Sequence, residues 1–212
     1  MTSALHRDGD AIETADLSVA MCTRNGARFV AEQVRSILSQ SIVPRELVVG
    51  DDASTDDTIA VIEAAVAAAR AERPGLSTEL RVLRRDEPLG VTANFEATIA
   101  ACTNTLVALS DHDDVWRQGR LARLLPLFDD PSVDLVHTDA RLVDEDGTPS
   151  GLLLLEALEA SAAERRALRT GHAFDVLLRR NLVTGATVIL RRSLAETAAP
   201  FPPSWLHDEW LA

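Results

Sequence analysis

The stretch ELVVGDDASTDDTIAVIEAAVAAARAE, residues 46–72, decides the fold class of this 212-residue chain. Its first six residues form an apolar run that ends in a carboxylate, which is typical of a buried strand. From Ser54 onward, apolar residues recur at spacings of three and four, which predicts a helix over 54–72. We expect a capping box at its start, formed by Ser54 and Asp57. A buried strand followed by an amphipathic helix is the repeating unit of α/β folds.

The same alternation of strand and helix continues on both sides of this stretch. We expect further strands at 17–23, 80–85, 105–110, 133–139 and 186–192, and further helices at 29–40, 91–102 and 119–128. Apolar, uncharged strands separated by helices require a parallel sheet that is covered on both faces. The predicted fold class is therefore α/β, with a mostly parallel central sheet and helices on both faces.

The length and the patterning predict a single domain. Residues 1–16 are polar and unpatterned and are expected to form a disordered tail, so the domain spans 17–212. Within it, 144–147 predicts a turn and 151–172 is helix-prone. A hydrophobic content of 46% supports a globular chain with a real core.

The charged residues exclude several classes of function. The formal net charge of −12 argues against a nucleic-acid binder, because such proteins neutralise phosphates with a basic surface. All the basic residues are arginine, and the absence of lysine excludes P-loop, pyridoxal and protein-kinase chemistry. No two glycines form a G-x-G pair, so the dinucleotide fingerprint is missing. If the chain handles phosphate, a metal or arginine must neutralise it.

The cysteines and the apolar runs indicate a cytoplasmic location. Cys22 and Cys102 stand in no C-x-x-C pair, and we expect two buried, reduced thiols rather than a zinc site or a disulfide. The N-terminus shows no signal-peptide pattern, and no apolar run approaches the roughly 20 residues of a membrane span. We expect at most a peripheral association with the inner face of the membrane.

Carboxylates follow two of the predicted strands. Asp51 and Asp52 end one strand, and Asp111, Asp113 and Asp114 follow another in the sequence LSDHDDVW. Ligands of open parallel sheets collect at the carboxyl ends of the strands, and Mg²⁺ or Mn²⁺ prefers such oxygen ligands. The alternative is a solvated acidic loop, or a helix N-cap formed by Asp114 at the start of the next helix. The spacing alone leaves both open.

Four segments together resemble a known family. LSVAMCTRNGARFVAEQVRSILSQS (17–41), ELVVGDDASTDDT (46–58), LGVTANFEATIAAC (89–102) and LVALSDHDDVW (106–116) occur in the order and spacing of family 2 glycosyltransferases of the inverting GT-A type. The motifs GVTANFE and SDHDDVW are most similar to those of the rhamnosyltransferase-like branch, which is associated with bacterial surface polysaccharide assembly. The resemblance covers 17–212 and implies the GT-A fold.

The resemblance implies roles for residues at two strand ends. Thr23 and Arg24, at the end of the first strand, would line the nucleotide pocket. Asp51 or Asp52 would contact the base or the ribose of a nucleotide sugar.

The resemblance also assigns the acidic cluster. Asp111 and Asp113 match the two aspartates of the family's D-x-D motif. Asp113 would be the direct ligand of Mg²⁺ or Mn²⁺, and Asp111 would lie nearer the ribose and sugar while contributing to the metal site. Asp114 would be supportive, and His112 would be a spacer that points away from the site.

A base for the acceptor hydroxyl is implied near the C-terminus. In the resembling proteins an acidic motif at the start of a late helix supplies it, and HDEW (207–210) stands in that place. Asp208 matches the base position better than Glu209. The alternative is a helix N-terminus that favours acidic residues because of its dipole. Relatives usually continue beyond the equivalent of Ala212, so the resemblance implies that the acceptor site is incomplete in this stretch.

The expected function is metal-dependent transfer, with inversion, of a sugar from a dTDP- or UDP-sugar to a glycan or lipid-linked acceptor. A hexosyl or rhamnosyl transfer is implied. One rival is a metal-dependent sugar nucleotidyltransferase or hydrolase, but nucleotidyltransferases of this shape open with a glycine-rich, lysine-bearing loop that CTRNGAR lacks. Another rival is a degenerate, non-catalytic transferase that acts as a binding partner.

Overall fold

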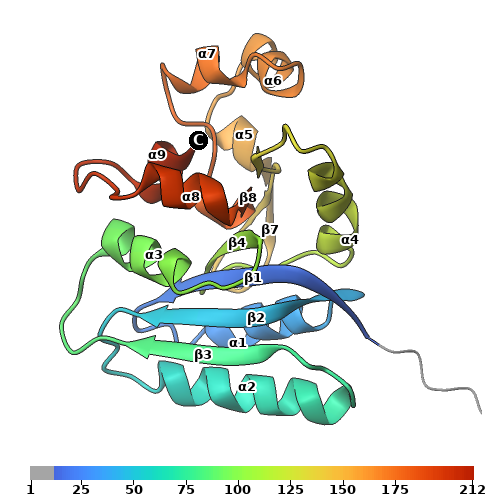
Figure 1. The fold of residues 1–212 in the computed structure, drawn as a ribbon, viewed down its shortest axis with the longest axis vertical. Helices are drawn as coiled ribbons and strands as arrows, with labels where there is room; N and C mark the ends of the chain where they lie inside the picture. The colour runs from blue at the N-terminus through green and yellow to red at the C-terminus, as the bar shows by residue number, and fades with distance from the viewer. Residues whose placement is uncertain (1–11) are drawn as a thin grey trace, which may run out of the picture.

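A computed structural model describes residues 12–212 of the chain, built around one six-stranded sheet (Figure 1). In spatial order the strands are β3 (Glu79–Arg84), β2 (Ile42–Asp51), β1 (Glu13–Thr23), β4 (Leu106–Asp111), β8 (Ile189–Arg191) and β5 (Leu135–Val136). Neighbouring strands from β3 to β4 are parallel, and β8 alone pairs antiparallel, with β4 and with β5. The predicted mostly parallel α/β sheet is confirmed.

Helices cover both faces of the sheet. One face packs on α1 (Val30–Leu38), α2 (Thr58–Glu72) and α4 (Arg120–Leu124), and the other on α3 (Val91–Ala100), α8 (Arg192–Ala198) and α9 (His207–Leu211). Because successive side chains of a strand point to opposite faces, Val19 and Met21 of β1 join the first core, whereas Ala20 and Cys22 join the second. All four are buried, as is usual for a strand covered on both sides.

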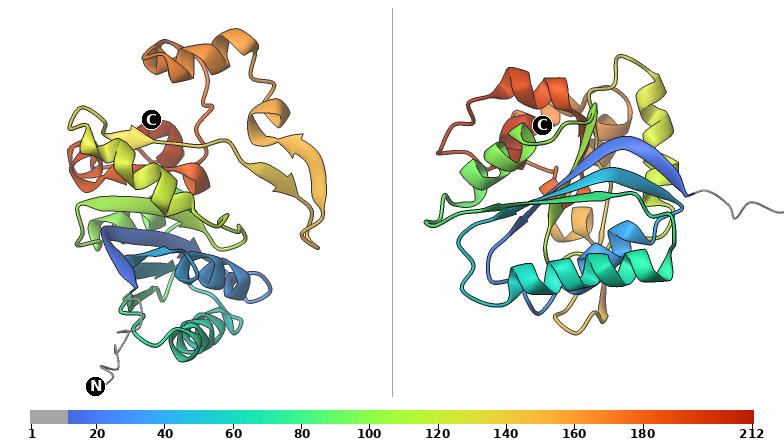
Figure 2. Two further views of the ribbon diagram at one scale, coloured as in Figure 1. Left: turned by 90° about the vertical axis from the view of Figure 1, so that its right-hand side faces the viewer. Right: turned by 60° about the horizontal axis from the view of Figure 1, so that its bottom comes forward.

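The segment between β5 and β8 leaves the sheet and returns to it at Val183 and Val188, which join the second core. It contains β6 (Arg141–Val143), β7 (Pro149–Leu153), α5 (Leu154–Ala157), α6 (Ala162–Arg169), α7 (Ala173–Leu177) and the 3₁₀ turn η2 (Gly185–Thr187), and a further 3₁₀ turn, η1 (Leu125–Asp129), follows α4. Figure 2 shows α6 and α7 standing away from the sheet, while the β6–β7 hairpin runs down its side. No helix in the described part of the chain combines the length and apolar character that a bilayer span requires.

The first strand begins earlier than the sequence predicts. Residues 13–16, assigned above to a disordered tail, belong to β1, because Glu13, Thr14 and Ala15 pair in parallel with the start of β2. The remainder of that predicted tail, 1–11, lies outside the described residues. The prediction also missed the first four residues of β2 (42–45), which contain Pro44, a residue that normally argues against a strand.

Three local predictions between residues 54 and 192 are wrong. The helix-prone segment 151–172 begins as strand β7, and only its later part is helical. The capping box expected at Ser54 does not form, because α2 starts at Thr58 and the Ser54 hydroxyl instead accepts a hydrogen bond from the Asn25 backbone N–H at 2.9 Å. The strands predicted at 133–139 and 186–192 do form, but their predicted lengths are wrong, because they span only two and three residues. The turn at 144–147 is confirmed by a hydrogen bond from the Gly147 N–H to the Asp144 carbonyl at 2.9 Å.

A buried carboxylate, that of Glu46, joins the strands at the edge of the sheet opposite to their carboxyl ends. Glu46 of β2 is 3% exposed. Its Oε1 accepts hydrogen bonds from the Ser18 hydroxyl at 2.9 Å and the Thr103 N–H at 2.8 Å, and its Oε2 accepts one from the Thr103 hydroxyl at 2.8 Å. The Arg81 guanidinium lies 3.6 Å from Oε2. This carboxylate therefore holds β1, β2, β3 and the loop before β4 together.

Replacement of Glu46 by Gln should destabilise the fold. The amide would place an N–H group where Oε2 now accepts a hydrogen bond from the Thr103 hydroxyl and faces the Arg81 guanidinium, so donors would face a donor. We expect the free energy of unfolding to fall by about 1.5–3 kcal/mol, measured by urea denaturation. Glu79→Gln is the matched control, because Glu79 is the exposed residue that pairs with Glu46 in β3. Equal stability of the two variants would contradict this role for Glu46.

Candidate active site

The parallel strands bring three predicted site residues to one edge of the sheet. Thr23 at the end of β1 pairs with Asp51 at the end of β2, and Cys22 pairs with Asp111 at the end of β4. The carboxyl ends of β2, β1 and β4 are therefore adjacent, as an open parallel sheet requires of a ligand site.

The two aspartates after β2 have different surroundings. The Asp52 carboxylate accepts hydrogen bonds from the backbone N–H groups of Leu89, at 2.6 Å, and Gly90, at 3.1 Å, and so holds the loop before α3. Asp51 accepts one from the Ser54 N–H at 3.3 Å through Oδ2, whereas its Oδ1 is buried without a partner in the described structure. The carboxylate oxygens of Asp52 thus already accept hydrogen bonds within the fold, whereas Asp51 keeps one acceptor atom free.

The loop after β1 is fixed against its neighbours. The Gly26 N–H donates to the Thr58 hydroxyl at 2.8 Å, and the Asn25 side chain accepts from the Thr55 N–H at 2.8 Å. This loop leaves Arg24 exposed, and the buried hydroxyl oxygen of Thr23 has no partner among the described residues. Thr23 and Asp51 therefore offer unused polar atoms at adjacent strand ends.

His112 packs against this loop. A β-carbon built on Gly26 would lie 2.3 Å from Cδ2 of His112, so only glycine allows the histidine ring to approach so closely. The imidazole thereby joins the loop after β4 to the loop after β1.

Four carboxylates gather at the end of β4. Burial, together with the charges of Asp114, Asp113 and Asp208, raises the pKa of Asp111 to about 7. Burial and the charge of Asp113 also raise the pKa of Asp114, while Arg120 and His112 oppose that shift. The fold therefore concentrates negative charge at this edge of the sheet.

The donor atoms of this cluster fit Mg²⁺ or Mn²⁺. Within residues 12–212, no group of three or more acidic, histidine or cysteine side chains is arranged to hold a metal by itself. Divalent cations of this kind are often bound by only one or two carboxylates, with phosphate oxygens and water as the other ligands. The raised pKa of Asp111 reflects burial and, after it, the neighbouring negative charges, and a bound cation would offset both.

Asp208 reaches the cluster from the far end of the chain. Its Oδ2 accepts a hydrogen bond from the Gly185 N–H at 2.9 Å, and its Oδ1 accepts one from the Asn181 side-chain amide at 3.4 Å. Neither Asn181 nor Gly185 was identified from the sequence as a site residue. The sequence offered one signal for them, a polar asparagine and a glycine close together in NLVTG (181–185), shortly before β8. The neighbouring Glu209 is exposed.

Helix α9 is held over α3 by aromatic stacking. The ring of His207 stacks on Phe95 with a centroid distance of 3.7 Å and an interplanar angle of 14°, and the Thr92 hydroxyl donates to the Trp205 carbonyl at 2.8 Å. A β-carbon on Gly185 would lie 2.6 Å from Nε2 of His207. Burial lowers the pKa of His207 to about 4, although Asp208 opposes the shift, so the ring is a neutral packing group at pH 7.

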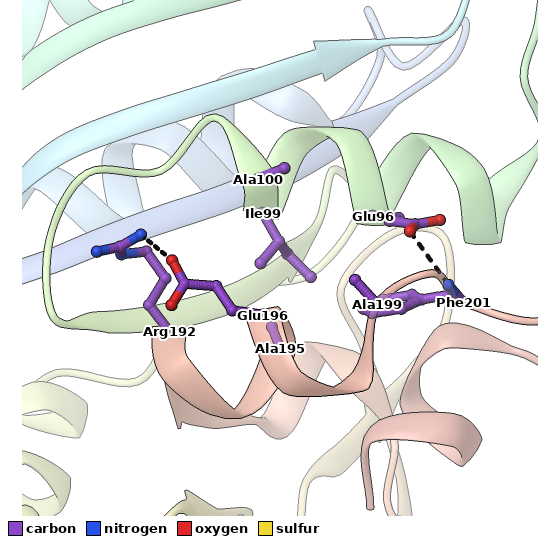
Figure 3. A pocket seen from close by; sticks show the side chains of 8 residues that line it. All are labelled: Glu96, Ile99, Ala100, Arg192, Ala195, Glu196, Ala199 and Phe201. Atoms are coloured by element: carbon purple, nitrogen blue, oxygen red, sulfur yellow. Dashed lines mark hydrogen bonds and ion pairs between the residues drawn. The ribbon is translucent and has the colours of Figure 1, made fainter.

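A separate cavity of about 320 Å³ lies between α3 and α8 (Figure 3). Apolar side chains such as Ile99 and Ala195 form much of its wall, and the Glu96 carboxylate accepts a hydrogen bond from the Phe201 N–H at 3.1 Å. None of the predicted site residues lines this cavity.

The raised pKa of Asp111 predicts how stability depends on pH in the metal-free protein. The folded state binds this proton more tightly than the unfolded state, where the pKa is near 3.8. The stabilisation is therefore complete below pH 3.8 and is lost as the pH rises through about 7. At pH 8 the free energy of unfolding of Asp111→Asn should therefore be about 2 kcal/mol higher than that of wild type. This is about half of what the full pKa shift would give, because water screens the carboxylate.

The measurement is urea denaturation at pH 5 and pH 8 in the presence of a chelator. The difference between Asp111→Asn and wild type should shrink at pH 5. Glu63→Gln, on the exposed face of α2, serves as the control and should show no such pH dependence. An Asp111→Asn variant that is no more stable than wild type at pH 8 would contradict the raised pKa of Asp111.

Comparison with known proteins gives relatives that are longer than this chain. An uncharacterized glycosyltransferase of Nostoc sp., alr2836, is 28% identical over an alignment of 172 residues that covers 74% of this chain and 47% of the relative. The succinoglycan biosynthesis protein ExoU of Rhizobium meliloti is 34% identical over 110 residues, 52% of this chain and 30% of ExoU. The chain thus spans half the length of these curated relatives or less.

The fold is shared with a solved transferase structure. The mannosyltransferase PcManGT from Pyrobaculum calidifontis, in complex with GDP-Man and Mn²⁺, superposes with a TM-score of 0.59 at 21% identity, covering 92% of this chain and 50% of that chain. The GT-A fold predicted from the sequence is confirmed. Residues 18–196 match the model of Glycosyl transferase family 2, and the chain therefore belongs to that family.

Proposed function

We propose that this chain carries the active site of an inverting, metal-dependent glycosyltransferase. It would transfer a sugar from a nucleoside-diphosphate sugar to an acceptor hydroxyl in the synthesis of a bacterial surface polysaccharide or cell-wall glycan. One observation carries the proposal: the carboxylates at the end of β4 lie between unused polar atoms on Thr23 and Asp51 and the carboxylate of Asp208. Family membership and the naming of ExoU for succinoglycan biosynthesis support it.

The nucleoside would bind over the ends of β1 and β2. Oδ1 of Asp51 is buried and lacks a partner, so it can accept a hydrogen bond from a base N–H or a ribose hydroxyl. We assign this contact to Asp51 because Asp52 already accepts two backbone N–H groups. Thr23 and the exposed Arg24 would complete the nucleotide pocket. UDP and dTDP are the proposed donor nucleotides, and the complex of PcManGT with GDP-Man makes GDP a third to test.

Asp113, with Asp111, would hold Mg²⁺ or Mn²⁺ in this site. A divalent cation there would stabilise the negative charge that develops on the departing nucleoside diphosphate. The complex of PcManGT with Mn²⁺ supports the choice of metal. Because the chain contains no lysine, only its arginines could otherwise neutralise a diphosphate.

Asp208 would take the proton from the acceptor hydroxyl. The Gly185 N–H and the Asn181 amide orient its carboxylate, and lone pairs remain on both oxygens for an acceptor hydroxyl. A base on the side opposite to the leaving group produces inversion at the transferred carbon, since the acceptor oxygen then attacks from that side. The acceptor would be a glycan or a lipid-linked glycan.

The finer assignments rest on the motifs. The transferred sugar would be a hexose or rhamnose, as GVTANFE and SDHDDVW suggest. The two free, buried cysteines suit a reducing compartment, and we place the enzyme in the cytoplasm, at most peripheral to the membrane.

Nucleotide binding that depends on a metal tests the proposal. Calorimetric titration with UDP, dTDP and GDP should show binding of at least one of them with Mn²⁺ and at least about tenfold weaker binding with a chelator. Asp113→Ala should bind equally weakly in both conditions, because it lacks the proposed metal ligand. Glu63→Ala should behave like wild type. Tight binding of a nucleotide by Asp113→Ala would contradict the assignment of Asp113 as the metal ligand.

Kinetics tests the role of Asp208. Asp208→Asn should bind the nucleotide as wild type does, while turnover falls roughly 10²- to 10⁴-fold, the usual contribution of a general base. Glu209→Gln is the control and should keep its activity, since Glu209 is exposed. Loss of activity in Glu209→Gln alone would move the base by one residue, and full activity in both variants would exclude this helix as its source.

A further inference from the structure

A cavity of about 540 Å³ lies beside the acidic cluster, on the side of α4. Its wall includes the loop Asp113–Gln118, α4, the β6–β7 hairpin and Thr187. The hairpin is fastened to the loop after β1 by ion pairs of Arg28 with Glu145, at 2.8 Å, and with Asp146, at 3.7 Å. The hairpin thus closes one side of the cavity, which is large enough for a sugar.

Arg120 lines this cavity with hydrogen-bonding capacity that the fold does not use. Its Nε and Nη2 atoms are both buried and without a partner in the described structure. Its guanidinium carbon lies 4.6 Å from the centre of the Trp116 ring, so stacking holds the group in place. The Trp116 Nε1 atom is also buried and unpartnered.

The unsatisfied nitrogens of Arg120 have a specific geometry. Nε and Nη2 form one edge of the guanidinium, where two N–H bonds run side by side and match two oxygens of a carboxylate or a phosphate. Leaving buried donors of this kind unpaired is costly, and native structures rarely do so without a reason. Burial lowers the pKa of Arg120 to about 10, with Asp114 opposing the shift, so no ion pair compensates the buried charge fully.

The other charged groups of the cavity do not give it a net positive charge that would attract any anion. Its wall carries three further arginines and four carboxylates. One of those carboxylates, that of Asp139, already accepts hydrogen bonds from the backbone N–H groups of Ala140 and Leu155, both at 3.0 Å. Selectivity would therefore rest on the one guanidinium edge rather than on net charge.

We propose that this cavity is a subsite for a sugar that bears a carboxylate or a phosphate, and that Arg120 determines this specificity. The inference rests on the proposed sugar transfer, because the cavity adjoins Asp113 at one end and Thr187, close to Gly185, at the other. The acidic sugar can belong to the donor or to the acceptor, and both would present the same oxygens to Arg120.

Binding measurements in two arms test the inference. The first arm uses free sugars without nucleotide, comparing methyl β-glucuronide and glucose 6-phosphate with methyl β-glucoside by titration calorimetry or saturation-transfer NMR. The second arm compares UDP-glucuronate with UDP-glucose in the presence of Mn²⁺. In at least one arm the acidic sugar should bind about tenfold more tightly or better, as expected for a charge-assisted pair of hydrogen bonds. A preference in the first arm assigns the acidic sugar to the acceptor, and one confined to the second assigns it to the donor.

Three variants locate the preference. Arg120→Gln should abolish it, and Arg120→Lys should lose most of it, because lysine keeps the charge but not the paired N–H groups. Arg123→Gln should retain it, since Arg123 is an exposed arginine of the same cavity. If Arg120→Gln does not fold, Arg120→Lys decides.

No preference in either arm, or a preference that survives both changes at Arg120, would overturn the inference. Failure of the protein to bind UDP, dTDP or GDP with Mn²⁺ would instead contradict the proposed function. The free-sugar arm does not require a nucleotide, so it separates these two failures.

Discussion

Repulsion between carboxylates at one edge of the sheet is the constraint on which the arrangement of this protein depends. Parallel pairing of β1 with β2 and β4 puts Asp51 and Asp111 at the ends of the two strands that flank β1, and the loop after β4 adds Asp113 and Asp114. Burial and, after it, the like charges of Asp114, Asp113 and Asp208 make the charged form of Asp111 unfavourable and raise its pKa. A site built in this way favours ligands that bring a cation with them.

The opposite end of the same strands shows how the fold treats a carboxylate that serves stability. Glu46 is as deeply buried as Asp51, but both of its oxygens accept hydrogen bonds, and Arg81 lies beside it. Asp51 keeps a buried oxygen without a partner. The same sheet therefore satisfies its polar groups at one edge and leaves acceptors and donors unused at the other, where a ligand can satisfy them.

Contacts between uncharged rings join the strand ends of the site to helix α9, which carries Asp208. Phe95 of α3 stacks on His207, and the missing side chain of Gly185 makes room for that ring. This contact sets the position of α9 and brings Asp208 to the end of β4, nearly a hundred residues away in sequence. Arg120 is held in a similar way, by the face of Trp116. In both cases an aromatic ring positions a group whose hydrogen bonds remain available.

The sequence by itself determined the α/β class, the order of the first strands and helices, and the edge where Asp51 and Asp111 meet. Periodicity reports which face of an element is buried, and carboxyl ends of parallel strands must coincide. It did not reveal the free acceptor on Asp51, the anchoring of Asp208 or the unpaired edge of Arg120. Those depend on contacts between residues far apart in the chain, which only tertiary packing sets. The bounds of the short strands β5 and β8, which lie within the predicted strands 133–139 and 186–192, escaped prediction for the same reason, because pairing with neighbours rather than local pattern sets where they begin and end.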